Sequence, residues 1–278
     1  MPELEAGARE EVRRNLAAVW ARARVRVVAS FRNREWFIGE TVFPFLTMAG
    51  FILVYRGLRA PAVYEAFVVL GGAMIAYWNN VLWSMASQFF WDKEQGILQL
   101  YLIAPVSRMS ILFGMALGGL VMTTSRAGAI LLGGVLVFDV SFPLDRVLPA
   151  LGLFVLSLAA VYALGMILCS LFLLWGREIW HTATLFQEPV HLVTGFFFPV
   201  RALGMGVAVL ASLLPVTLGL DGIRQVFYGS AARGLLPLAW IPWILLALLA
   251  VYLVLARISL RAMEERGKRE GRLTVRGA

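Results

Sequence analysis

Two Glu-x-x-His segments stand close together in the sequence, Glu178 with His181 and Glu188 with His191. Paired segments of this kind supply the ligands of carboxylate di-metal sites in helical bundles. Here both pairs fall on one predicted helix, which Pro189 interrupts, so they lie far apart along its axis. We therefore expect a polar cap from the first pair, hydrogen bonds from the second, and no metal site. Zinc-protease, serine-hydrolase and aspartyl-pair motifs, which would indicate a membrane-embedded enzyme, do not occur in the sequence.

Two charged residues fall inside long apolar runs. Arg126 lies in the middle of one run, where an unpaired arginine costs about 2.5–3.5 kcal/mol of insertion free energy. It therefore needs a partner or water, and Glu188, at a similar depth in a later run, is the partner that we predict. Such a pair can be structural or can line a transport pathway, and the sequence leaves both open.

Polar residues at helical spacing mark one face of another apolar run. Asn80, Ser84, Ser87 and Trp91 fall on this face, with Trp83 beside them. Ordinary interhelical hydrogen bonds, worth about 0.6–2 kcal/mol each, are one explanation. A translocation face is the other. The candidate pathway residues are Asn80, Trp83, Ser84, Ser87, Arg126 and Glu188.

These polar residues are conspicuous because the rest of the chain is very apolar. Of its 278 residues, 60% are hydrophobic and only 15% are charged, against about a quarter in soluble domains. Several apolar runs reach the length of about 20 residues that a bilayer requires. The N-terminus has no apolar signal-peptide core, and the single cysteine, Cys169, can form no internal disulfide. The composition predicts an all-α polytopic membrane protein.

We predict six transmembrane helices, at about 38–55, 66–90, 109–138, 148–175, 179–198 and 236–256. Six crossings place both ends of the chain on one side. Lysine and arginine number eighteen on that side and six on the other, so the positive-inside rule makes both termini cytoplasmic. The membrane that we expect to hold the chain is the cell inner (plasma) membrane. The expected domains are an N-terminal segment at 1–37, a transmembrane domain at 38–256 and a basic tail at 257–278.

Three segments lie outside these spans. Residues 9–34 alternate apolar and basic residues as an amphipathic helix suited to the headgroup region, or as a solvated helix packed on a soluble partner. Residues 199–230 are apolar but contain Gly204, Gly206 and Pro215, so we expect re-entrant or interfacial short helices on the outer side. Residues 91–108 form a polar interruption, which we read as a short helix at the membrane face, offered to a partner.

Three blocks of the sequence resemble the ABC-2 type permeases, the membrane subunits of type-2 ABC exporters. The first is D-K-E-Q-G-I-L-Q at 92–99, followed by A-P-V-S at 104–107. It is similar to the family pattern E-x-E-x-G-T-x-E…T-P-V-S, from which Ile97 and Gln99 depart. The second is G-F-F-F-P at 195–199, and the third is L-P at 214–215 with D-G-I-R at 221–224.

The resemblance implies an exporter permease that works as a homodimer, each copy bound to a separate ATPase. It makes 91–105 the coupling helix, with ATP and Mg bound by the partner and no cofactor in this chain. The implied ATPase-coupling residues are Asp92, Lys93, Glu94, Gln95, Gly96, Leu98 and Pro105. The implied outer-gate residues are Phe196, Phe197, Phe198 and Pro199, although an interfacial aromatic belt is the alternative. Such a pathway suits an amphipathic or lipid-linked substrate.

The chain has no G-x-x-x-x-G-K-[ST] loop, so any ATP-driven motor is expected on another chain. The partners that we predict are therefore an ABC ATPase, a second permease and membrane lipid, with no nucleic acid. A secondary transporter that works without an ATPase is the alternative function. It would need ion-coupling carboxylates in paired, inverted halves, and the two halves of this sequence show no such symmetry. A membrane-embedded enzyme is the third possibility. The substrate class stays open among drugs, lipids, polysaccharides and peptides.

Overall fold

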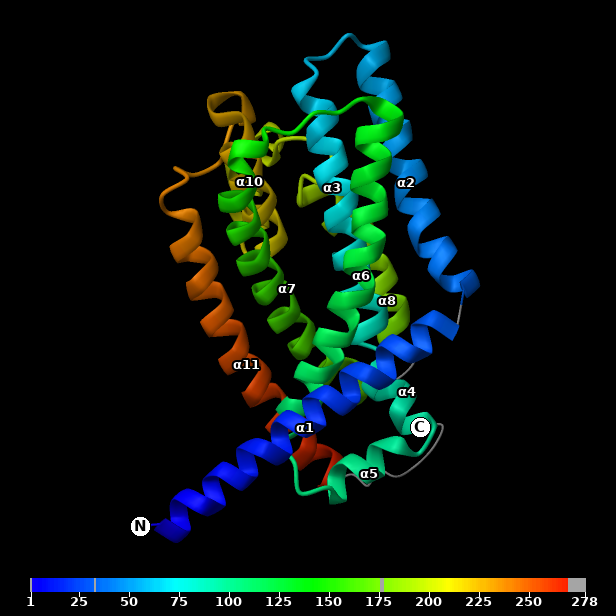
Figure 1. Ribbon diagram of the computed structural model, residues 1–278, viewed down its shortest axis with the longest axis vertical. Helices are drawn as coiled ribbons and strands as arrows, with labels where there is room; N and C mark the ends of the chain where they lie inside the picture. The colour runs from blue at the N-terminus through cyan, green and yellow to red at the C-terminus, as the bar shows by residue number, and fades with distance from the viewer. Residues whose placement is uncertain (1, 33, 176–177, 270–278) are drawn as a thin grey trace.

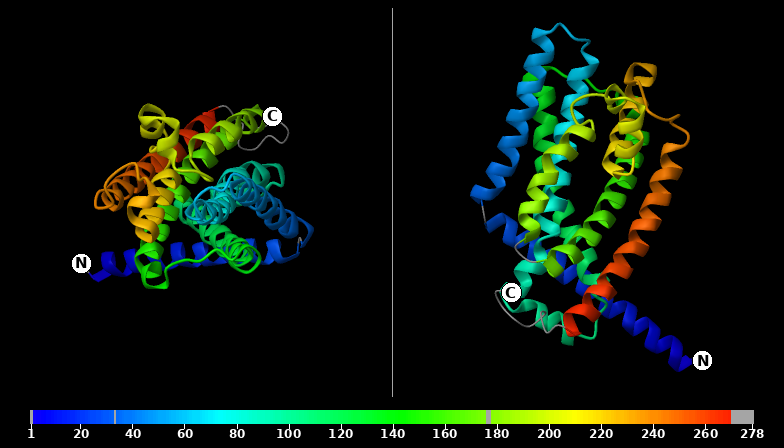
Figure 2. Two further views of the ribbon diagram at one scale, coloured as in Figure 1. Left: turned by 90° about the horizontal axis from the view of Figure 1, so that it is seen from above. Right: turned by 180° about the vertical axis from the view of Figure 1, so that it is seen from behind.

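The computed structural model describes residues 2–32, 34–175 and 178–269, which form a bundle of helices (Figure 1). No strand occurs in these segments. The long helices run side by side between two ends of the bundle, and shorter helices collect at each end (Figures 1 and 2). The prediction of an all-α polytopic architecture is confirmed.

Five segments of the described chain are long and apolar enough to cross a membrane, and each overlaps a predicted span. They are Ile38–Gly57, Val63–Glu94, Arg108–Phe138, Leu144–Ser170 and Ile241–Met263. The elements that contain them are α2 (Arg34–Gly57), α3 (Val63–Asn79) with η1 (Asn80–Met85) and α4 (Gln88–Glu94), α6 (Arg108–Phe138), η2 (Leu144–Arg146) with α7 (Val147–Trp175), and α11 (Ile241–Arg269).

The other predicted span, 179–198, forms a shorter helix than we expected. Helix α8 (Glu178–Val193) has 16 residues, or about 24 Å at 1.5 Å per residue. The hydrocarbon core of a bilayer is about 30 Å thick. The chain leaves the helix at Gly195, whose φ is 71°, a conformation that glycine adopts without steric cost. The aromatic residues that follow therefore lie in a turn beyond the helix.

Helices α9 (Met205–Ala211) and α10 (Pro215–Tyr228) form the bent pair that we predicted within 199–230. They follow η3 (Val200–Leu203), precede η4 (Gly229–Ala232), and meet at an angle of 110°. Asp221 and Arg224 on α10 are buried in protein. The Asp221 carboxylate accepts hydrogen bonds from Gln225 Nε2 at 2.9 Å and Leu235 N at 3.0 Å. The Asp221 carboxylate of this bent pair is thus satisfied inside the protein, as membrane depth requires.

The segments predicted to be cytoplasmic gather at one end of the bundle (Figure 1). Helix α1 (Pro2–Arg32) crosses this end obliquely, near α4, α5 (Ile97–Ile103) and the last turns of α11. The opposite end carries the connections that follow α2 and α6, together with η4. The long helices therefore alternate in direction, as successive membrane crossings require.

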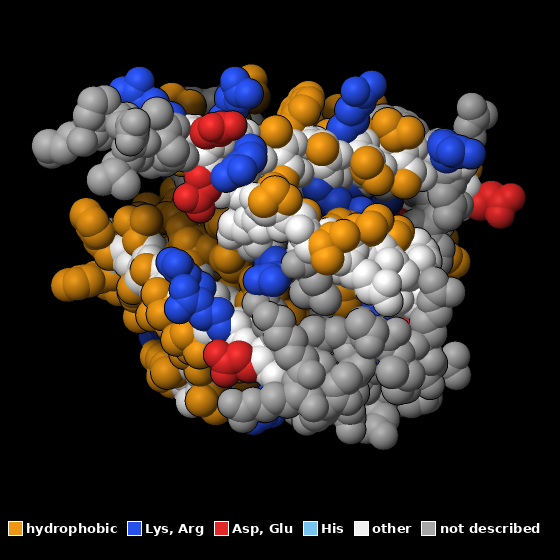
Figure 3. All heavy atoms as spheres, turned by 90° about the horizontal axis from the view of Figure 1, so that it is seen from below, with side chains coloured by type: hydrophobic (Ala, Val, Ile, Leu, Met, Phe, Trp, Pro, Cys, Tyr) orange, Lys and Arg blue, Asp and Glu red, His pale blue; other side chains and the backbone are white. Residues whose placement is uncertain are grey.

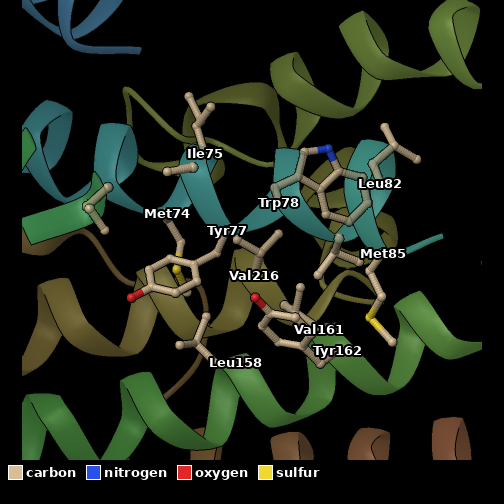
Figure 4. Close-up of a cluster of buried hydrophobic side chains, with 14 of the residues drawn as sticks. Met74, Ile75, Tyr77, Trp78, Leu82, Met85, Leu158, Val161, Tyr162 and Val216 are labelled. Atoms are coloured by element: carbon tan, nitrogen blue, oxygen red, sulfur yellow. The ribbon is translucent and has the colours of Figure 1, made fainter. Parts of the chain in front are cut away.

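Helix α3 and its continuation occupy the centre of the bundle. In the most apolar stretch of this span 83% of the residues are buried, against 17% in the spans of α2 and α11. Figure 4 shows the packing at this centre, where Met74 and Tyr77 lie beside Leu158 of α7. The other spans surround this helix, and α2 and α11 lie at the periphery of the bundle.

The central span contains a π-helical turn, η1. Its wide turn is closed by a hydrogen bond of 2.9 Å from the Ala86 N–H to the Val81 carbonyl. A π-turn adds a residue to the turn and rotates the residues that follow it relative to a regular helix. The residues after Asn80 therefore do not keep the single polar face that regular helical spacing predicts.

Candidate functional site

The first part of the site is the contact between α1 and α6. Gly114 and Gly118 of α6 lie directly against the backbone of α1. A Cβ atom on Gly114 would lie 2.6 Å from the Val19 carbonyl oxygen, and one on Gly118 would lie 2.8 Å from the Ala23 carbonyl oxygen. Glycines four residues apart allow two helices to approach this closely. Helix α1 is thus docked on a membrane-spanning helix, with Trp20 on its outer face 72% exposed.

Two arginines of α1 bind the end of the central span. Arg22 Nη2 donates to Asp92 Oδ2 at 2.7 Å, and Arg26 Nη1 donates to Gln88 Oε1 at 2.8 Å. Arg26 also donates to the Ser84 hydroxyl. Burial lowers the pKa of Arg26 to about 10, so its guanidinium stays protonated at neutral pH and these charge-assisted bonds persist.

Helix α1 also holds α5 and the segment that follows it. The Arg22 guanidinium lies over the Tyr101 ring, 5.6 Å from its centroid, a cation–π contact. Burial raises the pKa of the Tyr101 phenol, so this ring is neutral. At the far end the Ser107 N–H donates to Asn15 Oδ1 at 2.7 Å. Helix α1 therefore contacts the 91–107 segment near both of its ends, at Asp92 and Ser107, and between them at Tyr101.

The predicted coupling residues divide into a buried and an exposed set. Asp92, Lys93 and Leu98 are buried, so they position the segment and do not form its outer surface. Gly96 has a φ of 76° and makes the sharp bend between α4 and α5. Gln95 and Pro105 are exposed, and Glu94 is half-buried.

The exposed face of α5 adds two residues that the sequence prediction did not name. Leu100 is 59% exposed and Ile103 is 79% exposed. Figure 3 views this end of the molecule, where hydrophobic and basic side chains lie interspersed. A helix of seven residues with exposed apolar side chains between polar ones offers a compact docking surface. Leu100 and Ile103 are three residues apart, so they lie on one face of the helix. This spacing of apolar residues is the signal in the sequence that would have identified them.

The second part of the site is a groove between α2 and α8. A pocket of about 890 Å³ is lined by residues of α2, the central span, α6 and α8. A pocket of about 450 Å³ continues from it towards the turn after α8. The two share Phe43, Pro44 and Asn79. They therefore form one groove, with α2 and α8 as its walls and α3 as its floor.

Arg126 lies in this groove, but its partner differs from the one that we predicted. Its guanidinium forms an ion pair with Glu40 of α2, and both residues line the larger pocket. Glu188 lines the neighbouring, smaller pocket. Similar depth in the sequence does not determine which helices are neighbours. Glu40 is the third residue of the predicted span 38–55, and a charge at the start of an apolar run is the signal that could have found it.

The predicted polar face of the central span is split between two environments. Trp83 lines the groove and donates its indole N–H to Gln187 of α8. Asn80 accepts a hydrogen bond of 3.1 Å from the Tyr162 hydroxyl of α7. Ser84 and Ser87 are engaged with Arg26 and with the Trp83 carbonyl. Asn80, Ser84 and Ser87 thus make contacts within the protein, and Asn79 lines the groove in their place.

The aromatic turn after α8 closes the far end of the groove. Phe197 and Phe198 line the smaller pocket, and Phe197 stacks on Phe51 of α2 with ring centroids 4.1 Å apart. Phe196 is fully buried, and its carbonyl oxygen would lie 1.6 Å from a Cβ atom on Gly71. The turn is therefore packed tightly against α3.

A buried arginine holds this turn in place. Arg224 of α10 donates to the carbonyl oxygens of Gly195 at 2.8 Å, Phe196 at 2.6 Å and Phe198 at 3.1 Å. It also donates to the Phe67 carbonyl of α3 at 3.0 Å. The Arg224 side chain is the D-G-I-R arginine of the third sequence block. Its hydrogen bonds join three of the elements that surround the predicted outer gate.

The Glu-x-x-His segments give no cluster of ligands. Within the described segments no group of three or more His, Cys, Asp or Glu residues could hold a metal ion. The side chains of Glu178 and His181 lie outside the described residues. Glu188 and His191 both line the smaller pocket of the groove.

The comparisons with known proteins agree with this architecture. The family described as ABC-2 type transporter matches residues 17–228 of the 278. A comparison with curated proteins finds no match. The matched region runs from the part of α1 that docks on α6 to the end of α10 and includes the whole groove. With more than half of its residues matched, this multi-pass membrane chain belongs to the ABC-2 type transporter family, whose members are membrane components of ABC transporters.

Proposed function

We propose that the chain is the permease of an ATP-driven exporter, working as a pair of permeases with two separate ATPase subunits. The observation that carries the proposal is the construction of the 91–107 segment. Its exposed face, Leu100 and Ile103, is free to meet a soluble partner, while its buried face is fastened to α1 and to the central span. A force on this face is passed to membrane helices, because the attachment is made by short charge-assisted bonds.

The proposed conformational change moves three helices together, α5, α1 and α6. Closure of the ATPases on ATP displaces α5, and the bonds of Arg22 and Arg26 carry α1 with it. Helix α1 is packed on α6 through Gly114 and Gly118, so α6 follows. The groove between α2 and α8 is the proposed pathway. The aromatic turn at 196–199 is its outer gate, and the termini lie on the cytoplasmic side of the inner membrane.

The docking surface can be tested with one charge substitution. We expect Ile103→Glu to reduce co-purification of the permease with its ATPase at least about tenfold, because a buried unpaired carboxylate at an interface costs several kcal/mol. The matched control is Leu144→Glu. Leu144 is 86% exposed at the opposite end of the molecule, and this variant should co-purify normally. Equal recovery of ATPase with both variants would contradict the proposed surface.

The secondary-transporter alternative predicts a different result in the same preparation. Transport by the proposed exporter should stop when the ATPase is replaced by a hydrolysis-deficient variant that still binds. Transport that continues in proteoliposomes containing the permease alone would favour the ion-coupled alternative. This measurement separates the two functions without knowledge of how the ATPase docks.

A further inference from the structure

The groove has an unequal set of charges. The carboxylates of Glu35 and Glu40 line its larger pocket and Glu188 lines the smaller one. The guanidinium of Arg126 is the basic group that the pocket linings contain, and it forms an ion pair with Glu40. With the histidine neutral, the described lining carries an excess of two negative charges. Glu40 lies within the membrane-length segment Ile38–Gly57, where a carboxylate is costly and usually functional.

Two further polar residues line the smaller pocket beside Glu188. Asn79 Oδ1 and His191 Nε2 are buried without a hydrogen-bond partner among the described residues, and both residues line this pocket with Glu188. Glu188 and His191 are three residues apart on α8, so they lie on one face of that helix. A carboxylate with an amide and an imidazole in the same lining matches a group that has N–H donors and a positive charge.

Aromatic rings form much of the surface around these polar residues. Phe51, Phe197 and Phe198 line the smaller pocket, and Trp83 and Trp91 line the larger. Aromatic faces attract cations and also bury apolar surface. The smaller pocket thus offers a polar site around Glu188, and the two pockets together offer a longer apolar surface.

We propose that this groove binds an amphipathic organic cation, with its ammonium head among Asn79, Glu188 and His191 and its apolar body against the aromatic walls. This inference rests on the proposed function, because it names the substrate class of the pathway assigned there. An anionic lipid headgroup is a poorer fit, because the described lining has one arginine, which is already paired with Glu40. Charge complementarity therefore selects a cation.

The test measures binding to the purified permease alone, in nanodiscs of zwitterionic lipid. The probe is dansylcadaverine, a fluorescent amphipathic primary amine, compared with its neutral N-acetyl derivative and with dansyl-6-aminohexanoate, an anion. We expect saturable binding of the amine, at least about tenfold tighter than binding of either comparison compound.

Variants at Glu188 assign the head site. Glu188→Gln should weaken amine binding at least about tenfold, and Glu188→Asp, which keeps the charge, should restore most of it. The matched control is Asp145→Asn, which removes a carboxylate that is 76% exposed in η2, and it should bind like the wild type. Unchanged elution volume and melting temperature of each variant establish that it is folded.

Four outcomes would overturn the proposal, three of them in the comparison of probes or variants. These three are equal affinity for the amine and its acetyl derivative, tighter binding of the anion, and amine binding that Glu188→Gln leaves unchanged. Absence of saturable binding by all three probes would also overturn it and would indicate that lipid or a second copy fills the groove. Because no ATPase is present, a negative result here is distinct from a failure of the permease to co-purify with its ATPase.

Discussion

At the scale of single residues, the groove depends on one ion pair inside the membrane. Arg126 is 6% exposed and Glu40 is 21% exposed, so this ion pair is largely desolvated. Replacing a buried ion pair by apolar groups is often tolerated, whereas removing one partner strands the other charge. The pair joins α6 to α2 at the wall of the larger pocket.

A double-mutant cycle tests this dependence. We expect Glu40→Gln to lower the melting temperature of the purified permease strongly, because breaking a buried pair costs about 3–5 kcal/mol. The double variant Glu40→Gln with Arg126→Met should recover much of that loss. Losses that simply add, measured by thermal unfolding of the four proteins, would show that the two side chains do not interact.

At the scale of elements, α1 is attached to the rest of the bundle at two places, α4 and α6. Its arginines hold α4 by hydrogen bonds, and its backbone lies against the glycines of α6. These attachments have different tolerance to substitution. Side-chain bonds can adjust by rotation, but a backbone contact with no space for a Cβ atom cannot. The glycine contact is therefore where the link between α1 and the membrane helices is most easily broken.

Leucine substitutions on α6 distinguish this contact from a general effect on the helix. Gly118→Leu should separate α1 from α6 and reduce ATPase-driven transport at least about tenfold, because the side chain has no space beside Ala23. Gly128→Leu on the same helix should transport normally, because nothing lies within 4 Å of a Cβ atom there. Equal activity of the two variants in proteoliposomes would show that the close approach of α1 is not needed for transport.

At the scale of the whole molecule, the bundle has two different ends. One carries α1, α4 and α5, and the other carries the turns after α2 and α6 and the pair α9–α10 (Figures 1 and 2). The excess of lysine and arginine lies with the first set of segments. An asymmetry of this kind orients a membrane protein with its basic end in the cytoplasm.

Cysteine labelling tests this orientation directly. The natural Cys169 is buried, so single cysteines can be introduced at Leu144 and Ile103, which lie at opposite ends. With a membrane-impermeant maleimide, Leu144→Cys should react in intact cells, and Ile103→Cys should react only after permeabilisation. The reverse pattern would place the docking surface of α5 outside and would exclude an ATPase partner there.

Hydropathy, charge and local motifs were enough to predict the architecture of this chain. Five of the six predicted spans are membrane-length helices of the structure, and the glycines and prolines of 199–230 correctly indicated a bent pair. These properties are local, because a run of apolar residues or a proline acts on its own segment wherever that segment lies. The position of the polar segment at 91–108, between two spans, is determined in the same way.

Only the tertiary structure decided which polar residues share a space. Asn80, Ser84 and Ser87 form hydrogen bonds within the protein and do not line the groove. The packing of α2 against α6 gave Arg126 the carboxylate of Glu40. Packing also buried Asp92 and Lys93 and left Leu100 and Ile103 exposed on the same short segment. The physical reason is that an ion pair or a pocket depends on which helices are neighbours and on how each is rotated. Neither property is encoded in the depth of a residue along its own helix.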